Sequence, residues 1–172
     1  KYRKTEIKIS EPIEQVATIA FKQLREKCKN NEYIEVRRTS SIVSSNAKSK
    51  IVLKRLLKTN IRSVKAQKDY LTNGILSRKY LQAMIYFAFM DVFYRSGFLY
   101  DNFDEYDSND LDELKSLISN INFELFRANR TIHLNPSFGI ATNMIHGADA
   151  DLIIDENLID IKFIANDSYS YS

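Results

Sequence analysis

Cysteine, glycine and histidine are scarce in this chain of 172 residues. Its single cysteine, Cys28, excludes an internal disulfide and a cysteine-rich zinc site, and it fits a reducing, cytoplasmic compartment. Four glycines, none of them clustered, exclude a glycine-rich phosphate loop. The two histidines, His133 and His146, do not have the spacing of paired ligands on one helix, which disfavours a zinc hydrolase.

Long apolar runs are also missing. No stretch reaches the roughly 18 apolar residues expected of a membrane span. No basic leader is followed by an apolar run and a cleavage site. We therefore expect neither a membrane protein nor a secreted one.

Acidic residues are absent from one long stretch, between Arg37 and Lys68. Residues 1–100 carry 21 lysines and arginines against 8 acids, whereas residues 101–172 carry 4 against 14. Such a basic segment favours binding to polyanions, although a solvated basic helix without a partner has the same composition. The candidate nucleic-acid contacts are Lys48, Lys50, Lys54, Arg55, Lys58, Arg62, Lys65 and Lys68.

The first half of the chain predicts two helices and a short strand. A helix is expected from a Ser10 cap to about Asn30, and a basic helix over about residues 50–68, with a possible break at Thr59-Asn60. Between them, residues 33–36 have strand composition, and the serine-rich residues 40–49 indicate a linker.

The second half predicts further helices separated by an acidic segment. Ser77 suits a helix N-cap and Gly97 the end of the same helix. Its expected apolar surface comprises Leu81, Met84, Ile85, Ala88, Phe89 and Val92. Residues 101–110 indicate an exposed loop, after which a helix begins at Asn109 or Asp110, with a further helical turn over residues 123–127.

The most specific pattern lies near the end of the chain. Gly-Ala-Asp-Ala-Asp-Leu-Ile-Ile occupies residues 147–154, and Leu-Ile-Asp-Ile-Lys occupies residues 158–162. Both runs are β-rich and a polar turn separates them, so they predict a hairpin. A two-residue loop at Glu156-Asn157 pairs Asp151 with Lys162 and puts Asp160 on their face. The aliphatic side chains are then buried on the other face: Leu152, Ile154, Ile159 and Ile161.

Other loop lengths have different consequences for this hairpin. A four-residue loop keeps the same parity, whereas a three-residue loop separates Asp151 from the face of Asp160 and Lys162. With the parity kept, two carboxylates and an ammonium share one face. Mg²⁺ takes carboxylate, water and phosphate oxygens, and it makes a nucleophile of a bound water. A lysine beside it can orient that water.

These residues resemble the PD-(D/E)XK nuclease superfamily, the restriction-endonuclease-like fold. In that pattern an Asp opens the second core strand and (Asp/Glu)-x-Lys closes the third. The match covers about residues 133–164, and residues 133–139 resemble the first core strand or its entry loop. The resemblance implies that Asp151 and Asp160 bind Mg²⁺ or Mn²⁺ and that Lys162 is the catalytic lysine.

The resemblance also implies auxiliary acids. Asp149 is an auxiliary metal ligand or an alternative to Asp151. An acid on the first core helix often assists in this superfamily, and Glu113 and Glu124 are both candidates. The family core continues with another helix and strand after its Asp-x-Lys strand, but only ten residues follow Lys162.

We therefore expect an α/β fold with a helical, basic N-terminal region (residues 1–76) packed on a small nuclease-like core (residues 77–172). The core is expected to be truncated after its third strand and completed by a further segment or a larger complex. The implied function is metal-dependent hydrolysis of phosphodiester bonds in DNA, with RNA left open. The alternative is an inactive nuclease-like subunit that binds nucleic acid or serves assembly.

Overall fold

The computed structural model describes residues 6–9, 13–38, 41–46, 49–134, 136 and 150–161. It has a mixed α/β structure, as the sequence predicted. The chain divides into two compact units, a helical unit of Ile13–Ile121 and a smaller unit of residues 1–12 and 122–172. The boundary expected after residue 76 falls inside the helical unit, because the helices on either side of it pack against each other.

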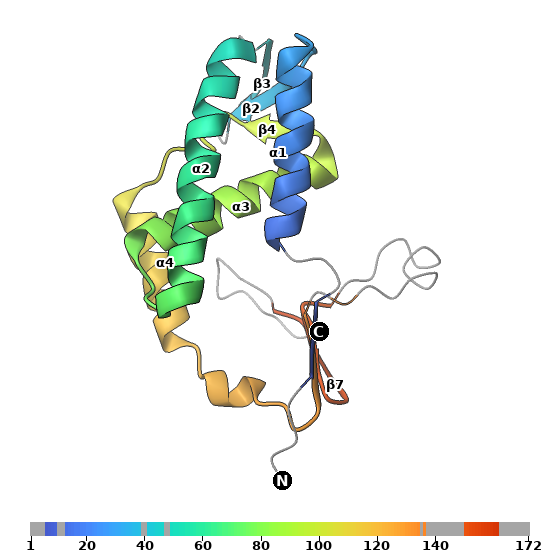
Figure 1. Ribbon diagram of the computed structural model, residues 1–172, viewed down its shortest axis with the longest axis vertical. Helices are drawn as coiled ribbons and strands as arrows, with labels where there is room; N and C mark the ends of the chain where they lie inside the picture. Colours follow the sequence, from blue (N-terminus) through green and yellow to red (C-terminus); the bar gives the residue numbers. More distant parts are fainter. Residues whose placement is uncertain are drawn as a thin grey trace, which may run out of the picture. The chain divides into compact units, whose positions relative to one another are not determined.

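The helical unit contains the four α-helices of the described chain: α1 (Ile13–Lys29), α2 (Ser49–Asn73), α3 (Arg78–Ser96) and α4 (Ser108–Asn120). The first three pack on one another, and α4 packs on α3 (Figure 1). α2 runs unbroken through Thr59 and Asn60, so the expected break is wrong. Thr59 is buried, and Asn60 accepts a hydrogen bond of 3.2 Å from the Tyr86 hydroxyl. These tertiary contacts outweigh the low helix propensity of the two residues.

Both ends of α3 follow their sequence signals. The Ser77 hydroxyl accepts a hydrogen bond of 3.2 Å from the amide of Tyr80, which confirms the N-cap. Gly97 has a φ of 77° and donates its N–H to the Phe93 carbonyl at 2.8 Å, so it ends the helix in the left-handed conformation that glycine adopts without strain.

A three-stranded sheet completes the helical unit, with strand order β3-β2-β4. β2 (Glu35–Arg38) overlaps the strand predicted over residues 33–36 but begins and ends two residues later, and β4 (Phe98–Tyr100), parallel to it, was not predicted. β3 (Ser41–Asn46) pairs antiparallel with β2 in the segment expected to be a linker. That expectation is wrong because a ladder of backbone hydrogen bonds outweighs the turn preference of serine.

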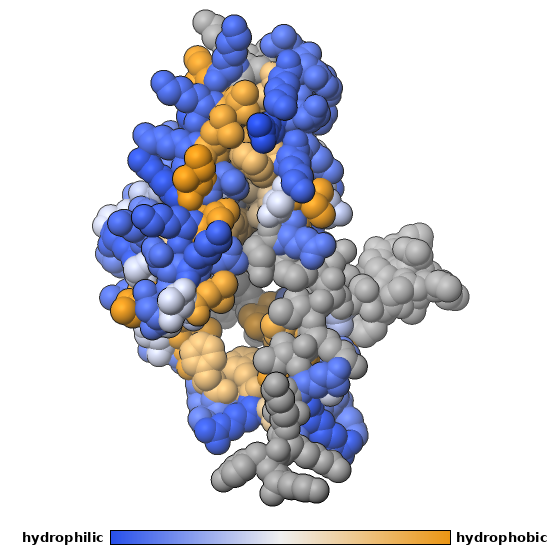
Figure 2. All heavy atoms as spheres, in the orientation of Figure 1, coloured by the Kyte–Doolittle hydropathy of each residue, from blue (hydrophilic) through white to orange (hydrophobic). Residues whose placement is uncertain are grey.

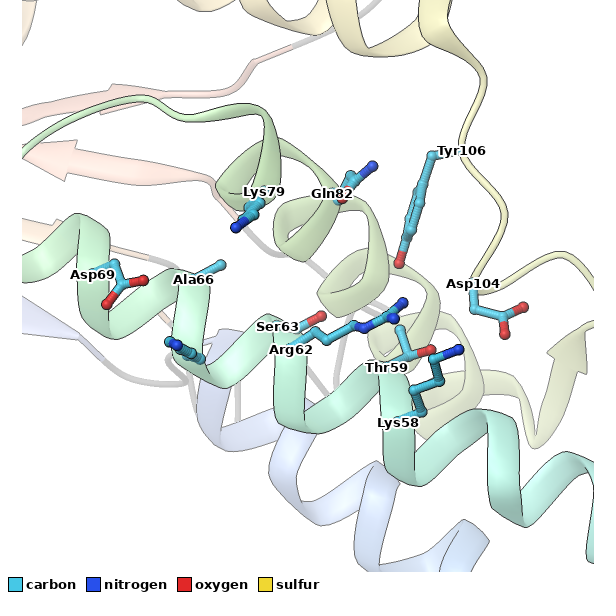
Figure 3. A pocket seen from close by; sticks show the side chains of 11 residues that line it. Lys58, Thr59, Arg62, Ser63, Ala66, Asp69, Lys79, Gln82, Asp104 and Tyr106 are labelled. Atoms are coloured by element: carbon cyan, nitrogen blue, oxygen red, sulfur yellow. The ribbon is translucent and has the colours of Figure 1, made fainter.

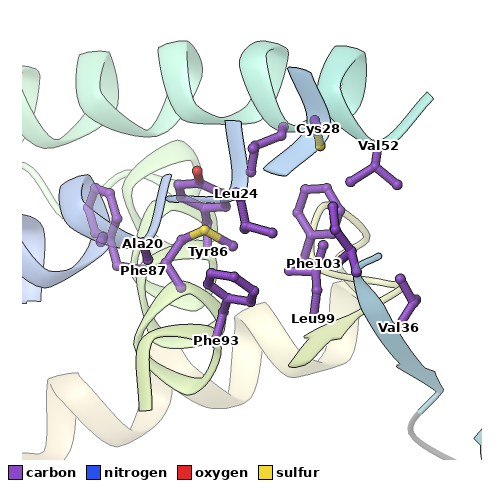
Figure 4. Packing of buried hydrophobic residues seen from close by; sticks show 14 of the residues in the cluster. Ala20, Leu24, Cys28, Val36, Val52, Tyr86, Phe87, Phe93, Leu99 and Phe103 are labelled. Carbon is purple, nitrogen blue, oxygen red and sulfur yellow. The ribbon is translucent and has the colours of Figure 1, made fainter. Parts of the chain in front are cut away.

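The hydrophobic core is built around α3, whose buried side chains pack against those of α1, α2 and the sheet (Figure 4). Of the surface expected for this helix, only Leu81 is fully buried; the other buried residues are Ala83, Tyr86, Phe87, Met90 and Phe93. The expectation missed the buried face because α3 is apolar around most of its circumference, so its periodicity does not distinguish one side from another.

The acidic segment after β4 is a loop up to Asp107, as predicted, but it is only partly exposed, because α2 holds it. Phe103 is only 1% exposed. The Arg55 guanidinium donates to both carboxylate oxygens of Asp104, at 3.0 and 3.1 Å from Nε, and to the Asp101 carbonyl at 2.6 Å. The hydrogen bond from Arg55 to Asp104 is the main reason why the pKa of Arg55 is raised. Arg55 also lies 5.1 Å from the centre of the Phe103 ring.

The smaller unit contains a four-stranded sheet with the order β1-β5-β6-β7. Its strands are β1 (Glu6–Ile9), β5 (Thr131–Leu134), β6 (Leu152–Ile154) and β7 (Asn157–Ile159). β1 is parallel to β5, and the other neighbours are antiparallel. The 3₁₀ helix Phe123–Phe126 precedes β5 and confirms the helical turn predicted there. The helical unit is therefore inserted in the chain between two neighbouring strands.

Apolar side chains also reach the surface of the helical unit. Figure 2 shows them between α1 and α2, with hydrophilic side chains on both sides. On α2, Ile51, Ile61 and Leu71 are each more than half exposed. Over the described ranges, no helix has the length and apolar character needed to cross a membrane.

The contact between Arg55 and Asp104 predicts a difference between neighbouring cations of α2. Arg55→Gln should lower the free energy of unfolding by about 1–3 kcal/mol, because it leaves the partly buried Asp104 carboxylate without its charged donor. Lys54→Gln, at an exposed position, should change it by less than about 0.5 kcal/mol. Urea unfolding followed by circular dichroism measures both. Equal effects of the two substitutions would mean that the ion pair does not hold the segment.

Candidate metal and nucleic-acid site

The hairpin predicted near the end of the chain is present, with a different turn. The two-residue loop is Asp155-Glu156, one residue earlier than expected, so that Ile154 pairs with Asn157 and Leu152 with Ile159. Each partner thus shifts by two positions, which preserves the parity of the faces. Continued by one position beyond the paired residues, this register puts Asp151 opposite Asp160 instead of Lys162.

Burial separates the two faces of β6 as the alternation predicted. Leu152 is 7% and Ile154 5% exposed, whereas Asp151, which directly precedes the strand, is exposed. The expectation fails at the end of β7. Ile159 is only half-buried, and Ile161 is 61% exposed, because among the described residues the pairing of β7 ends at Ile159.

The two candidate metal ligands that the structure describes are exposed and lie at the same end of the hairpin. The carboxylate of Asp151 accepts a hydrogen bond from the backbone N–H of Ile161, the residue after Asp160. Like charges at directly opposed positions of two strands destabilise the pair, and a divalent cation relieves that repulsion. The other two predicted residues, Asp149 and Lys162, lie outside the described residues.

Asp155 explains why the chain turns where it does. It adopts a left-handed conformation with a φ of 54°, which Asp tolerates better than most residues. Its carboxylate accepts hydrogen bonds of 2.8–2.9 Å from three successive amides, those of Asn129, Arg130 and Thr131. Its own N–H donates to the Thr131 carbonyl at 2.9 Å.

These hydrogen bonds have an electrostatic consequence for Asp155. They lower the pKa of its carboxyl from 3.8 to about 2, with the bond from Thr131 contributing most. From the sequence, Asp155 is expected only to be part of a polar turn. An Asp at a tight turn does indicate that its side chain bonds backbone amides, because a short carboxylate often does so. The sequence could not identify which amides, because they lie 24 to 26 residues earlier in the chain.

The two candidate helix acids belong to different units. Glu113 is exposed on α4 in the helical unit. Glu124 is exposed in the 3₁₀ helix of the smaller unit, where it forms an ion pair of 2.8 Å with Arg127. Glu124 is thus the candidate in the same unit as the hairpin. Within the described part of the chain, no three His, Cys, Asp or Glu side chains come together in a way that could hold a metal ion.

The basic residues of α2 form an exposed row. Successive members are three or four residues apart, so they follow one side of the helix. Among the residues described, no cation of this row forms an ion pair with a carboxylate. Arg55 differs, because Asp104 already engages its charge, so it is not counted in the row; its contact with nucleic acid stays a prediction. Lys48 lies outside the described residues. The row consists of Lys50, Lys54, Lys58, Arg62, Lys65 and Lys68.

Comparisons of this chain with protein-family models, with curated proteins and with solved structures find no match. The nuclease resemblance therefore depends on the residues of the hairpin.

The lowered pKa of Asp155 predicts a pH-dependent loss of stability. Asp155→Asn should destabilise the hairpin at pH 6, because the charged acceptor of three amides is lost. The difference from the natural chain should shrink as the pH falls from about 4 to about 2, since protonation then removes the same charge from Asp155. Urea unfolding at a series of pH values measures this difference. Glu156→Gln, in the same turn but with only a 3.9 Å ion pair, is the control and should show little pH dependence.

Proposed function

We propose that this chain is a metal-dependent nuclease that hydrolyses phosphodiester bonds in DNA, with Mg²⁺ or Mn²⁺ as the cofactor. The observation that carries the proposal is that Asp151 and Asp160 lie at the same end of an antiparallel hairpin, where the Asp151 carboxylate accepts a hydrogen bond from the N–H of Ile161 and Asp160 opens an Asp-x-Lys sequence. The meander of β5, β6 and β7 supports it, because the nuclease resemblance implies three consecutive core strands with an acid before the second and Asp-x-Lys at the end of the third.

The residues fit a hard divalent cation. Asp151 and Asp160 supply two carboxylates, and Mg²⁺ commonly binds through one or two carboxylates, completing its shell with water and substrate phosphate oxygens. When bound, the metal neutralises charge on the scissile phosphate and acidifies a bound water.

Each residue of the chain has a distinct part in this proposal. Asp151 and Asp160 hold the cation, and Lys162 orients the attacking water and stabilises charge as it develops on the phosphate. The water oxygen bonds to phosphorus, the bond from phosphorus to one sugar oxygen breaks, and that oxygen leaves with a proton. Asp149 serves as an additional ligand, and Glu124 is the helix acid in the same unit.

The exposed row on α2 supplies affinity for the backbone. Its lysines and Arg62 stand about 4.5–6 Å apart along the helix axis, given a rise of about 1.5 Å per residue. Contacts from such cations to phosphates position a protein on nucleic acid without reading sequence. The row thus supports nucleic acid as the substrate class.

One observation favours the alternative of an inactive subunit that binds nucleic acid or serves assembly. In the described ranges, Asp151 and Asp160 have no third acid or histidine close enough to complete a metal-binding group. A nuclease-like hairpin without such a group could retain binding and lack chemistry.

Substitution at the hairpin distinguishes these functions. Asp160→Asn and Lys162→Ala should each reduce Mg²⁺-dependent cleavage of plasmid and linear DNA by several orders of magnitude, because metal ligands and the water-orienting lysine act as a unit. Glu156→Gln, which removes a carboxylate from the same hairpin away from the opposed acids, is the matched control and should retain full activity. Circular dichroism verifies that all three proteins are folded.

The results assign the function directly. Cleavage that survives Lys162→Ala contradicts the catalytic assignment. Metal-independent DNA binding by a natural chain that cleaves neither DNA nor RNA supports the inactive subunit instead.

The exposed row predicts salt-dependent binding to duplex DNA. The logarithm of affinity should fall with the logarithm of salt by roughly 0.9 for each phosphate neutralised. Replacing Lys50, Lys54 and Lys68 with Gln should flatten that slope and weaken binding to all sequences alike. Fluorescence anisotropy at several salt concentrations measures this. An unchanged affinity and slope would make the row a solvated surface.

A further inference from the structure

A cavity of about 680 Å³ lies within the helical unit, separate from the hairpin acids. Residues from α2, α3 and the segment after β4 line it (Figure 3). Its volume falls within the roughly 300–1,000 Å³ typical of sites for small molecules. Its lining is rich in charged and polar side chains, and therefore suits a polar ligand.

The α2 wall of the cavity consists of small side chains. Thr59, Ser63 and Ala66 recur at intervals of four and three residues, so they share one side of the helix. All three residues are at most 6% exposed. Larger residues at these positions would fill the space, and the two hydroxyl groups put hydrogen-bonding atoms on this wall.

Four cations surround that wall: Lys58, Arg62, Lys65 and Lys79. In the part of the chain that the structure describes, none of them forms an ion pair with a carboxylate. The cavity also contains Asp69 and Asp104, but the charge of Asp104 is already engaged by Arg55. The lining therefore has an excess of positive charge, which favours a ligand with phosphate groups.

The opposite wall provides an aromatic ring and an amide. Tyr106 extends toward Arg62 in Figure 3, and Gln82 projects from α3. Burial, with a smaller contribution from Asp104 and opposed by Arg62, raises the pKa of Tyr106 to about 12, so its hydroxyl stays protonated at neutral pH. A ring of this kind can stack on a nucleobase, and the amide of Gln82 can donate to and accept from the base edge.

We propose that this cavity binds a nucleoside phosphate. The phosphates lie among Lys58, Arg62, Lys65 and Lys79, and the base lies against the Tyr106 ring beside Gln82. No glycine-rich loop is needed, because side chains of α2 and α3 supply the charge. The proposal is independent of cleavage at the hairpin, since the cavity and the opposed acids belong to different units.

Isothermal titration calorimetry of the full chain, with ATP, AMP, adenosine and tripolyphosphate as probes, tests this inference. The experiment is run in EDTA at about 0.15 M salt, so that metal binding at the hairpin does not contribute. We expect one ATP or AMP per chain and much weaker binding of adenosine and of tripolyphosphate. The double variant Arg62→Gln, Lys79→Gln should weaken ATP binding at least 10-fold. The matched control, the double variant Lys54→Gln, Lys68→Gln, removes two positive charges outside the cavity. It should change the affinity for ATP less than 2-fold.

Several results would overturn the proposal. Equal weakening by the two double variants would indicate diffuse attraction to a basic helix, and tripolyphosphate binding as tight as ATP binding would remove the role of the base. Single-stranded DNA that displaces ATP and depends on Arg62 and Lys79 in the same way would assign the cavity to a nucleic-acid path. Absence of ATP and AMP binding to a folded chain would refute it outright, whatever the hairpin does to DNA.

Discussion

Burial of α3 is the constraint on which the helical unit depends. This helix is apolar on several sides, so it is stable only when other elements cover it from more than one direction. α1 and α2 pack on it, and Phe103 closes the same core from the segment after β4. Arg55 can hold that segment against α2 because the core brings the two together. The same packing juxtaposes α2, α3 and Tyr106, which together enclose the cavity.

Charged residues in this chain serve two different purposes. Arg55 and Asp155 form hydrogen bonds within the fold. Arg55 donates to Asp104 in the loop after β4, and Asp155 accepts from three backbone amides at the hairpin turn. The remaining cations of α2 have no carboxylate partner among the described residues, so they are available to an anion. Composition cannot make this distinction, because Arg55 and Lys54 are equally basic in the sequence.

Local signals predicted the elements that depend on few residues. Ser77 and Gly97 marked the ends of α3, because a cap acts within one turn of its own helix. Predictions failed where distant partners decide. Ser41, Ser44 and Ser45 lie in a strand because β2 pairs with that strand. α2 continues through Thr59 and Asn60 because tertiary packing buries Thr59 and Asn60 bonds to Tyr86. At the candidate site, parity correctly separated acids from aliphatics on β6, but the register was shifted by the contacts of Asp155.

The sequence by itself determined the α/β character, the concentration of basic residues on one helix and the presence of a hairpin with acids near its ends. These follow from composition and from periods of two and 3.6 residues, which are properties of adjacent residues. Only the tertiary structure decided which residues oppose Asp151, that Arg55 binds within the chain, and that α2 and α3 enclose a cavity. Each of these depends on groups more than eight residues apart in the chain, whose contacts form only when the core and the sheet bring them together.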